Sequence, residues 1–311
     1  MQHTPSDRTT GFWRSALVAC TLWSAGAAHA LAVFACEPEW AALVRQLAPA
    51  ADVRSATHAR QDPHHIEARP GLIAQLRRAD LAVCTGAGME VGWLPMLQQR
   101  AGNARVQDGA AGMFFAAEQV TLIDARPAAG GNPFEGDVHA AGNPHVHLDP
   151  RRLLQVAAAL GKRLEQVDPA GAEGYRARTA AFQADWAARV AQWERRAVPL
   201  RGLRVAAQHS TFAYLWRWLG IEQVADLEPK PGVPPTPGHL QKPLEATRGA
   251  PPPAIVVAAS HQLRGAQWLA QQLGAPAKVL QLPSTVTEEA PTDTLAGFYD
   301  LLLAELLASA R

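Results

Sequence analysis

The stretch EGYRARTAAFQADWAARVAQWERRA, residues Glu173–Ala197, decides the fold that this sequence predicts. It contains no proline, and its single glycine, Gly174, stands near its start. Six mainly aromatic residues recur at steps of seven, four, four, three and four, which places them on one face of a helix about 35–40 Å long. They are Tyr175, Phe182, Trp186, Val190, Trp193 and Ala197. Such a stripe has to pack along something extended, so the stretch predicts a rigid helix that joins two lobes.

Short apolar runs alternate with helical patterns on both sides of this stretch. Unbroken apolar runs are typical of strands buried in a parallel sheet, and strands that alternate with helices predict an α/β fold. The predicted strands are residues 31–36, 80–84 and 120–123 before the long helix, and residues 203–207, 254–259 and 278–282 after it. Two stretches rich in proline and glycine, residues 125–144 and 229–243, are predicted as long loops without regular elements.

The first thirty residues have the pattern of an export signal. Arg8 and Arg14 give a positive start, residues 15–26 are mostly apolar, and Ala28-His29-Ala30 places small residues where a signal peptidase reads them. The apolar stretch is shorter than the roughly 20 residues that span a bilayer, so no direct membrane insertion is expected. We therefore expect a periplasmic protein that begins at Leu31. A lipid anchor at Cys20 is the less favoured alternative, because only five residues separate Arg14 from Cys20.

The predicted organisation follows from these elements. Residues 1–30 are the expected signal peptide, and residues 31–168 the N-terminal α/β lobe. Residues 169–198 are the expected linking helix, and residues 199–311 the C-terminal α/β lobe. Each lobe is expected to contain a mostly parallel sheet flanked by helices.

Composition narrows the class of function. The chain is 48% apolar and 18% charged, which excludes a disordered protein. Its net charge is +1, and without residues 1–30 it carries 27 basic and 27 acidic residues. There is thus no electrostatic reason to expect nucleic acid or an anionic membrane surface as a partner, and we expect a monomer. Two cysteines, Cys36 and Cys84, end predicted strands of the first lobe. A disulfide and two buried thiols remain open alternatives.

Three groups of histidines stand at positions where parallel sheets bind ligands. His64 and His65 lie in a loop before a predicted helix, His145 also precedes a helix, and His209 follows the strand of residues 203–207. All are at the carboxyl ends of strands or in the loops beyond them, which is the ligand-binding edge of open α/β sheets. Imidazole suits zinc, copper, nickel and iron. The pattern therefore predicts a transition-metal site, although no pair has the i, i+4 spacing of zinc proteases.

Read in order, several stretches resemble the metal-binding branch of the periplasmic solute-binding proteins of ATP-binding-cassette importers, the zinc and manganese family. The resemblance covers essentially the whole chain after the leader. It implies two lobes joined by a rigid helix, and a metal ion held between them by His64, His145 and His209. It also implies delivery of the ion, Zn²⁺ first and Mn²⁺ or another divalent transition metal second, to the membrane permease of an ABC importer. The matching stretches are Asp62-Pro63-His64 with Pro70, residues 79–81 through 86–90, Pro144-His145 with Leu148-Asp149-Pro150, the long helix, and residues 208–215.

The sequence departs from this family where a fourth, acidic ligand is expected. The equivalent stretch, Leu282-Pro283-Ser284-Thr285, has no carboxylate. His65 competes with His64 as ligand, and the loop of residues 125–144 carries only His139, whereas zinc-specific members often have a histidine-rich loop there. The fourth ligand therefore remains open, with five substitutes that the sequence does not rank: Glu228, His261, Glu288, Glu289 and Asp293.

Two other classes of function compete with metal capture. An exported zinc hydrolase would also use three histidines and keep a fourth position for water. No general base follows a ligand as in His-Glu-x-x-His, so we expect no enzyme. A binder of an organic solute would need an apolar cavity of a few hundred Å³. Glu37 and Glu90, beyond strand ends, are expected either to orient a histidine or to be solvated.

Overall fold

The computed structural model describes residues 1–2, 30–125, 139–230, 232–274 and 277–310. The expected signal peptide and the lipid-anchor alternative at Cys20 thus lie outside the described residues, apart from residues 1, 2 and 30. Most of the loop of residues 125–144 lies outside them too. Among the described helices, none is long and apolar enough to cross a membrane.

The N-terminal lobe is built on a four-stranded parallel sheet in the order β2-β1-β3-β4. Alternate residues of a strand face opposite sides of the sheet. Val33 therefore packs in the core that contains Trp40, whereas Phe34 packs with Leu72 and Leu97 on the other face. The strands are β1 (Ala32–Ala35), β2 (Asp52–Ser55), β3 (Leu81–Cys84) and β4 (Met113–Phe115), and the helices are α1 (Pro38–Leu47), α2 (Pro70–Arg78), α3 (Leu94–Ala101) and α4 (Pro150–Val167).

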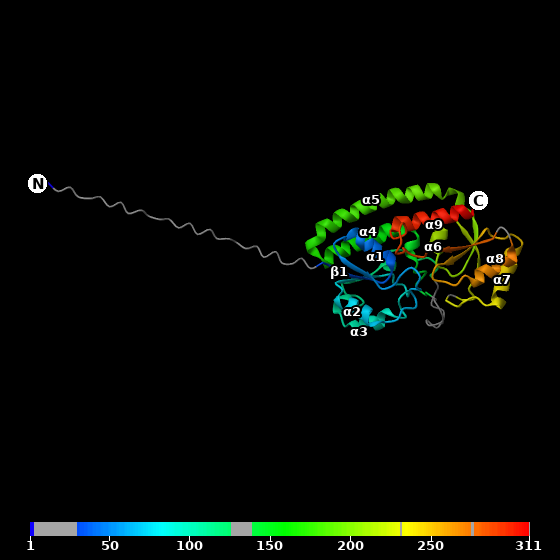
Figure 1. Cartoon of the computed structure of the whole chain (residues 1–311), viewed down its shortest axis with the longest axis horizontal. Coiled ribbons are helices and arrows are strands. Elements are labelled where there is room, and N and C mark those ends of the chain that lie inside the picture. The colour runs from blue at the N-terminus through cyan, green and yellow to red at the C-terminus, as the bar shows by residue number, and fades with distance from the viewer. Residues whose placement is uncertain (3–29, 126–138, 231, 275–276, 311) are drawn as a thin grey trace.

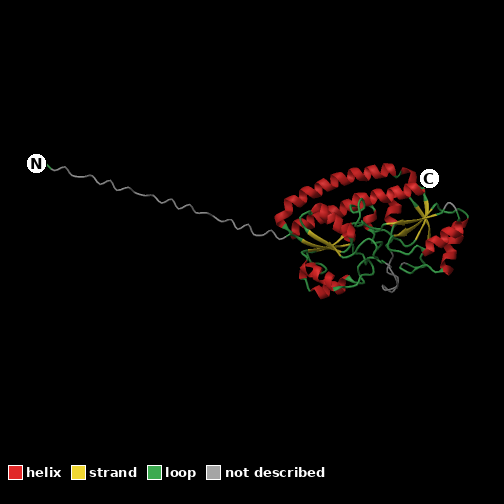
Figure 2. Ribbon diagram, in the orientation of Figure 1, coloured by secondary structure: helices red, strands yellow, loops and turns green. Residues whose placement is uncertain are grey.

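The C-terminal lobe repeats this topology with the order β6-β5-β7-β8, again parallel. Figure 2 shows one sheet in each lobe, with helices around it. The carboxyl ends of β1 and β2 in one lobe, and of β5 and β7 in the other, lead into segments that line the site. The strands are β5 (Arg204–Ala207), β6 (Glu222–Asp226), β7 (Ala254–Ala258) and β8 (Lys278–Leu282), and the helices are α6 (Ala213–Leu219), α7 (Pro237–Arg248), α8 (Arg264–Leu273) and α9 (Leu295–Ser309).

The long helix is α5 (Ala172–Arg196), and it runs along both lobes (Figure 1). Its aromatic stripe is buried. The indole nitrogen of Trp186 donates to the carbonyl of Pro150 at 2.8 Å, in the first lobe. Trp193 donates to Asp300 of α9 at 3.1 Å. One continuous core extends from β1 through α5 to β5, so the helix is a rigid connection. The predicted two-lobed α/β fold with a long connecting helix is confirmed.

Two local predictions were wrong. Residues 120–123 form no strand, because their backbone bonds elsewhere: the Ile123 N–H donates to the Tyr214 hydroxyl, and its carbonyl accepts from Asn143. The sheet instead uses β4, a few residues earlier. The stretch of residues 229–243, predicted as loop only, contains the start of α7. Pro237 occupies the first helical turn there, where its missing N–H costs nothing, and Thr236 caps that turn.

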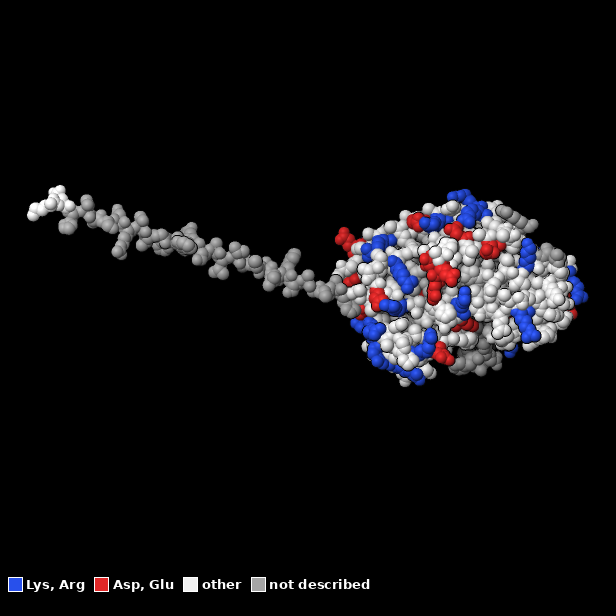
Figure 3. Space-filling model, in the orientation of Figure 1, with Lys and Arg blue, Asp and Glu red and all other residues white. Residues whose placement is uncertain are grey.

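Charged side chains are dispersed over the surface. On the face drawn in Figure 3, lysine and arginine are interspersed with aspartate and glutamate over both lobes. This mixture agrees with the near-zero net charge, and that face offers no basic tract for nucleic acid.

Candidate metal centre

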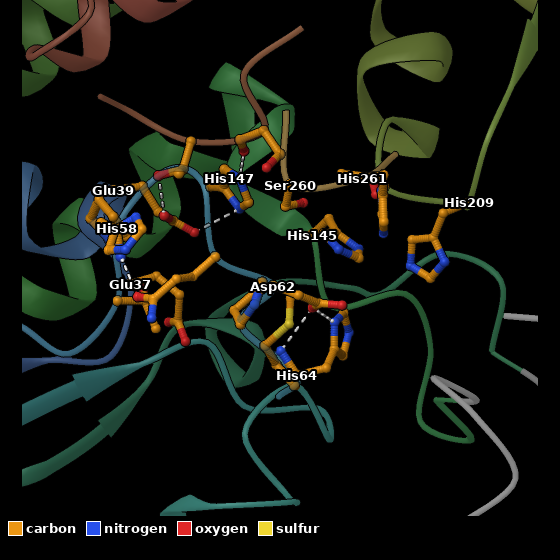
Figure 4. A pocket seen from close by; sticks show the side chains of 18 residues that line it. Glu37, Glu39, His58, Asp62, His64, His145, His147, His209, Ser260 and His261 are labelled. Carbon is orange, nitrogen blue, oxygen red and sulfur yellow. Dashed lines mark hydrogen bonds and ion pairs between the residues drawn. The ribbon is translucent and has the colours of Figure 1, made fainter. Parts of the chain in front are cut away.

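Three histidines from three separate segments meet between the lobes. His64 lies between β2 and α2, His145 precedes α4, and His209 lies two residues after β5. Each offers a ring nitrogen, and these nitrogens all lie within 4.8 Å of one another. The ring centroids are 5.7–5.9 Å apart. Figure 4 shows the rings of His145 and His209 beside each other at the edge of the cavity, with His64 completing the group.

The backbone at His209 is unusual for a residue with a side chain. Its φ of 68° is in the left-handed region, which costs free energy for a residue other than glycine. The N–H of His209 is held by Asp226 at 3.3 Å. The turn directs the ring from the end of β5 into the space between the lobes, and the side chain is only 2% exposed.

Each of the three rings is oriented by an acceptor on its Nδ1 atom. His64 Nδ1 lies 2.7 Å from Asp62 Oδ1, and His209 Nδ1 lies 2.9 Å from Glu228 Oε2. Carboxylates only accept, so both Nδ1 atoms carry the proton and both Nε2 atoms keep a lone pair. His145 Nδ1 lies 2.9 Å from Asn143 Oδ1. Because Asn143 Nδ2 donates to the Ser210 carbonyl, the oxygen of this amide faces the imidazole. The structure thus presents three oriented Nε2 lone pairs.

Burial keeps His145 in the neutral form that binds metal. Burial first, and then the neighbouring His209 and His64, hold the pKa of His145 well below its usual value. Asp62 responds in the opposite way. Burial raises its pKa, but the hydrogen bonds and charge of His64 outweigh burial and hold it well below the usual range. Neutral imidazoles beside an ionised carboxylate are the ligand forms that a divalent ion needs.

The structure separates the competing histidines. His64 is buried in the cluster, whereas the neighbouring His65 is exposed. His147 is turned toward the opposite end of the cavity (Figure 4). Its Nε2 lies 2.7 Å from the Ser284 carbonyl, and its Nδ1 lies 3.1 Å from Glu39. His147 therefore connects the lobes and does not face the three-nitrogen cluster.

The predicted substitutes for a fourth ligand have different positions. Glu228 stands behind His209 and orients it. His261 lines the cavity, with its ring centroid 5.7 Å from that of His209. The other three, Glu288, Glu289 and Asp293, are exposed on the surface and do not line the cavity.

One residue at the cluster, His139, was not among the ligands predicted from the sequence. His139 Nε2 lies 3.1 Å from His64 Nε2, with the two rings stacked. Burial first, and then the charges of His64 and His209, lower the pKa of His139 to about 3. The sequence offered one signal for this role: His139 lies only three residues before the stretch Gly142-Asn143-Pro144-His145, which contains a predicted ligand.

The cavity between the lobes is small. Its volume is about 30 Å³, room for an ion or a water molecule. Its lining includes Glu37, Glu39 and Thr285 besides the histidines. A pocket for an organic solute has a few hundred Å³, so this cavity does not fit that class of ligand.

Two buried carboxyl groups, Glu37 and Glu90, meet at Thr85, and Glu37 also lines this cavity. Glu37 accepts a hydrogen bond from the Thr85 hydroxyl at 2.9 Å, and Glu90 accepts from the backbone N–H groups of Thr85 and Gly86. Burial first, and then the charges of Glu90 and Glu39, raise the pKa of Glu37 well above its usual value. Burial also raises the pKa of Glu90, to about 7. Neither side chain is solvated, and neither contacts a ring of the three-histidine cluster among the described hydrogen bonds.

The two cysteines are joined. Cys36 and Cys84 form a disulfide with a Cα separation of 4.7 Å, in the range that such a bond requires. They directly follow β1 and end β3, which are neighbours in the sheet. The bond therefore fixes the sheet edge from which Glu37 and the loop of residues 86–90 extend.

Solved structures share this fold. The chain matches "Crystal structure of ZnuA" with a TM-score of 0.74 and 19% identity, covering 91% of this chain and 100% of that one. It matches a zinc-bound ZnuA deletion mutant with a TM-score of 0.69 and 20% identity, covering 91% and 96%. It also matches a cadmium-bound periplasmic metal-binding protein from Candidatus Liberibacter asiaticus with a TM-score of 0.71 and 15% identity, covering 90% and 99%. At these identities the likeness establishes the fold.

The family itself is shown by the sequence. Among curated proteins, none matches this chain. The family model of ZnuA, described as zinc-uptake complex component A, periplasmic, matches residues 33–308, which span both lobes and the long helix. The chain therefore belongs to the ZnuA family of periplasmic metal-binding transport proteins.

Proposed function

We propose that this chain captures Zn²⁺ through His64, His145 and His209 and delivers it to the membrane permease of an ABC importer. The observation that carries the proposal is the convergence of three ring nitrogens within 4.8 Å, from segments on both sides of the cavity. Imidazole nitrogen favours zinc over the oxygen-preferring Mn²⁺. Membership of the ZnuA family, with a zinc-bound and a cadmium-bound protein among the structural neighbours, supports a transition metal as cargo.

We further propose the organisation and setting that such a protein needs. Residues 31–168 and 199–311 act as the two lobes, with residues 169–198 as the linking helix. The chain is exported by a signal peptide of residues 1–30 and acts as a monomer in the periplasm. The ion-sized cavity between the lobes favours holding an ion over turning over a substrate, so we propose that the chain is not an enzyme.

The decisive experiment measures zinc binding by calorimetry in the parent and in single variants. His145→Ala and His209→Ala each remove one of three ligands and are expected to weaken binding far more than His239→Ala, a change in α7 away from the cavity. Metal analysis of protein purified without added metal or chelator is expected to find zinc. If both site variants bind zinc as tightly as the parent, the proposed site is wrong.

A further inference from the structure

The place where the family resemblance leads one to expect an acidic ligand is engaged in other contacts. The Thr285 hydroxyl donates to Glu39 Oε2 at 2.5 Å, and the Ser284 carbonyl lies 2.7 Å from His147 Nε2. These contacts join the lobes at the end of the cavity away from the three-histidine cluster. Residues 283–285, directly after β8, therefore offer no carboxylate, and their polar groups already hold the lobes together.

His139 instead approaches the cluster from the side of His64. Its Nε2 lies 3.1 Å from that of His64. Two nitrogens bound to one tetrahedral zinc at about 2.0–2.1 Å are about 3.3–3.4 Å apart. The observed separation is thus close to the distance between two ligands of one ion.

The contacts of the Nδ1 atoms show which atoms of His64 and His139 face each other. His64 Nδ1 gives its proton to Asp62. The His139 ring is hydrogen-bonded to the backbone of Ala87, and its Nδ1 atom lies against Gly88, where a Cβ atom would be 3.1 Å away. With both Nδ1 atoms engaged by the protein, the two Nε2 atoms face each other at hydrogen-bond distance. A metal ion can replace the proton that joins two such nitrogens, because metal binding releases protons from its ligands.

We propose that His139 is the fourth protein ligand, so that the ion is held by four imidazoles. This inference rests on the proposed function of the three-histidine site. A site of four neutral nitrogens without a carboxylate suits zinc and disfavours Mn²⁺, which prefers oxygen ligands. The chain is therefore a zinc-selective member of its fold, and His139 is a residue that determines this selectivity.

The test compares three variants with the parent. His139→Ala removes the fourth nitrogen, and His139→Asp replaces it with a carboxylate. His261→Ala tests the rival candidate for the fourth position, because this histidine lines the same cavity beside His209. Affinities for Zn²⁺ and Mn²⁺ are measured by competition with a chromophoric chelator, and the absorption spectrum of bound Co²⁺ reports the ligand set. The melting temperature of each metal-free variant shows whether it folds as the parent does.

We expect His139→Ala to weaken zinc binding at least about tenfold, since even residues that only orient a ligand cost 10- to 100-fold. It should also change the Co²⁺ spectrum. His261→Ala should weaken zinc binding less than His139→Ala does, and should leave the Co²⁺ spectrum like that of the parent. His139→Asp should lower the ratio of zinc affinity to Mn²⁺ affinity at least about tenfold. The inference is overturned if His139→Ala binds zinc as the parent does, or if the loss appears in His261→Ala instead. A parent that binds no zinc would refute the proposed function itself.

Discussion

Replacing Glu228 by glutamine tests whether orientation and charge behind a ligand matter here. Glu228 Oε2 lies 2.9 Å from His209 Nδ1, and the two residues are 8% and 2% exposed. Glutamine keeps the size of the side chain and an oxygen acceptor, but removes the negative charge. The substitution therefore removes the charge with little change in shape.

The size of the effect follows from the geometry. With a ring between them, the carboxylate and a zinc ion on Nε2 would be about 6–7 Å apart. For charges of −1 and +2 at an effective dielectric constant of about 20, their attraction is about 5 kcal/mol. This value is an upper bound before solvation and relaxation. Partners that orient metal-ligating histidines typically contribute 10- to 100-fold in affinity, or about 1.4–2.7 kcal/mol. We therefore expect Glu228→Gln to weaken zinc binding 10- to 100-fold.

Competition calorimetry at constant pH measures this loss. Glu222→Gln is the control, since it removes the same charge from an exposed position at the start of β6. The metal-free melting temperature of Glu228→Gln should stay near that of the parent. If Glu228→Gln binds zinc within about threefold of the parent, or if Glu222→Gln loses as much, Glu228 does not support the ligand as we argue.

Three further predictions concern stability, each measured by denaturant unfolding. The raised pKa of Glu37 contributes stability that is complete below its unfolded value of about 4.5 and is lost as pH rises through its folded value. Metal-free parent should therefore lose stability as pH rises above about 4.5, and Glu37→Gln should lose less. Gly161 of α4 lies against Thr179 of α5. Gly161→Ala should therefore lower the free energy of unfolding by about 1–3 kcal/mol, despite the better helix propensity of alanine. Adding Thr179→Ala should recover most of this loss. Reducing the Cys36–Cys84 bond, which closes a loop of 48 residues, should cost up to about 4 kcal/mol.

Each of these has a clear contrary result. Equal pH slopes for the parent and Glu37→Gln would show that this carboxyl group does not titrate abnormally. Additive effects in the Gly161/Thr179 pair would mean that the two helices do not meet at these residues. A variant without Cys36 and Cys84 should not respond to reductant. If reductant also leaves the unfolding midpoint of the parent unchanged, no disulfide stabilises the first lobe.

Local sequence determined the elements of this fold. The aromatic stripe of Glu173–Ala197 and the apolar runs in both lobes specify a long helix and buried parallel strands, because spacing alone fixes which face is apolar. The positions of His64, His145 and His209 after strands or before helices were also readable, since carboxyl ends of parallel strands share an edge. By contrast, β6 has the sequence EQVAD, which is too polar to predict a buried strand. It forms by pairing with β5.

Only the tertiary structure decided which side chains meet. It separated buried His64 from exposed His65, placed Glu228 behind His209, and brought His139 against His64. It also joined Cys36 to Cys84, which the sequence left open. Such contacts join residues far apart in the chain and depend on how the lobes and loops pack. Periodicity reports the face on which a residue lies, but it carries no information on the partner that packing brings to that face.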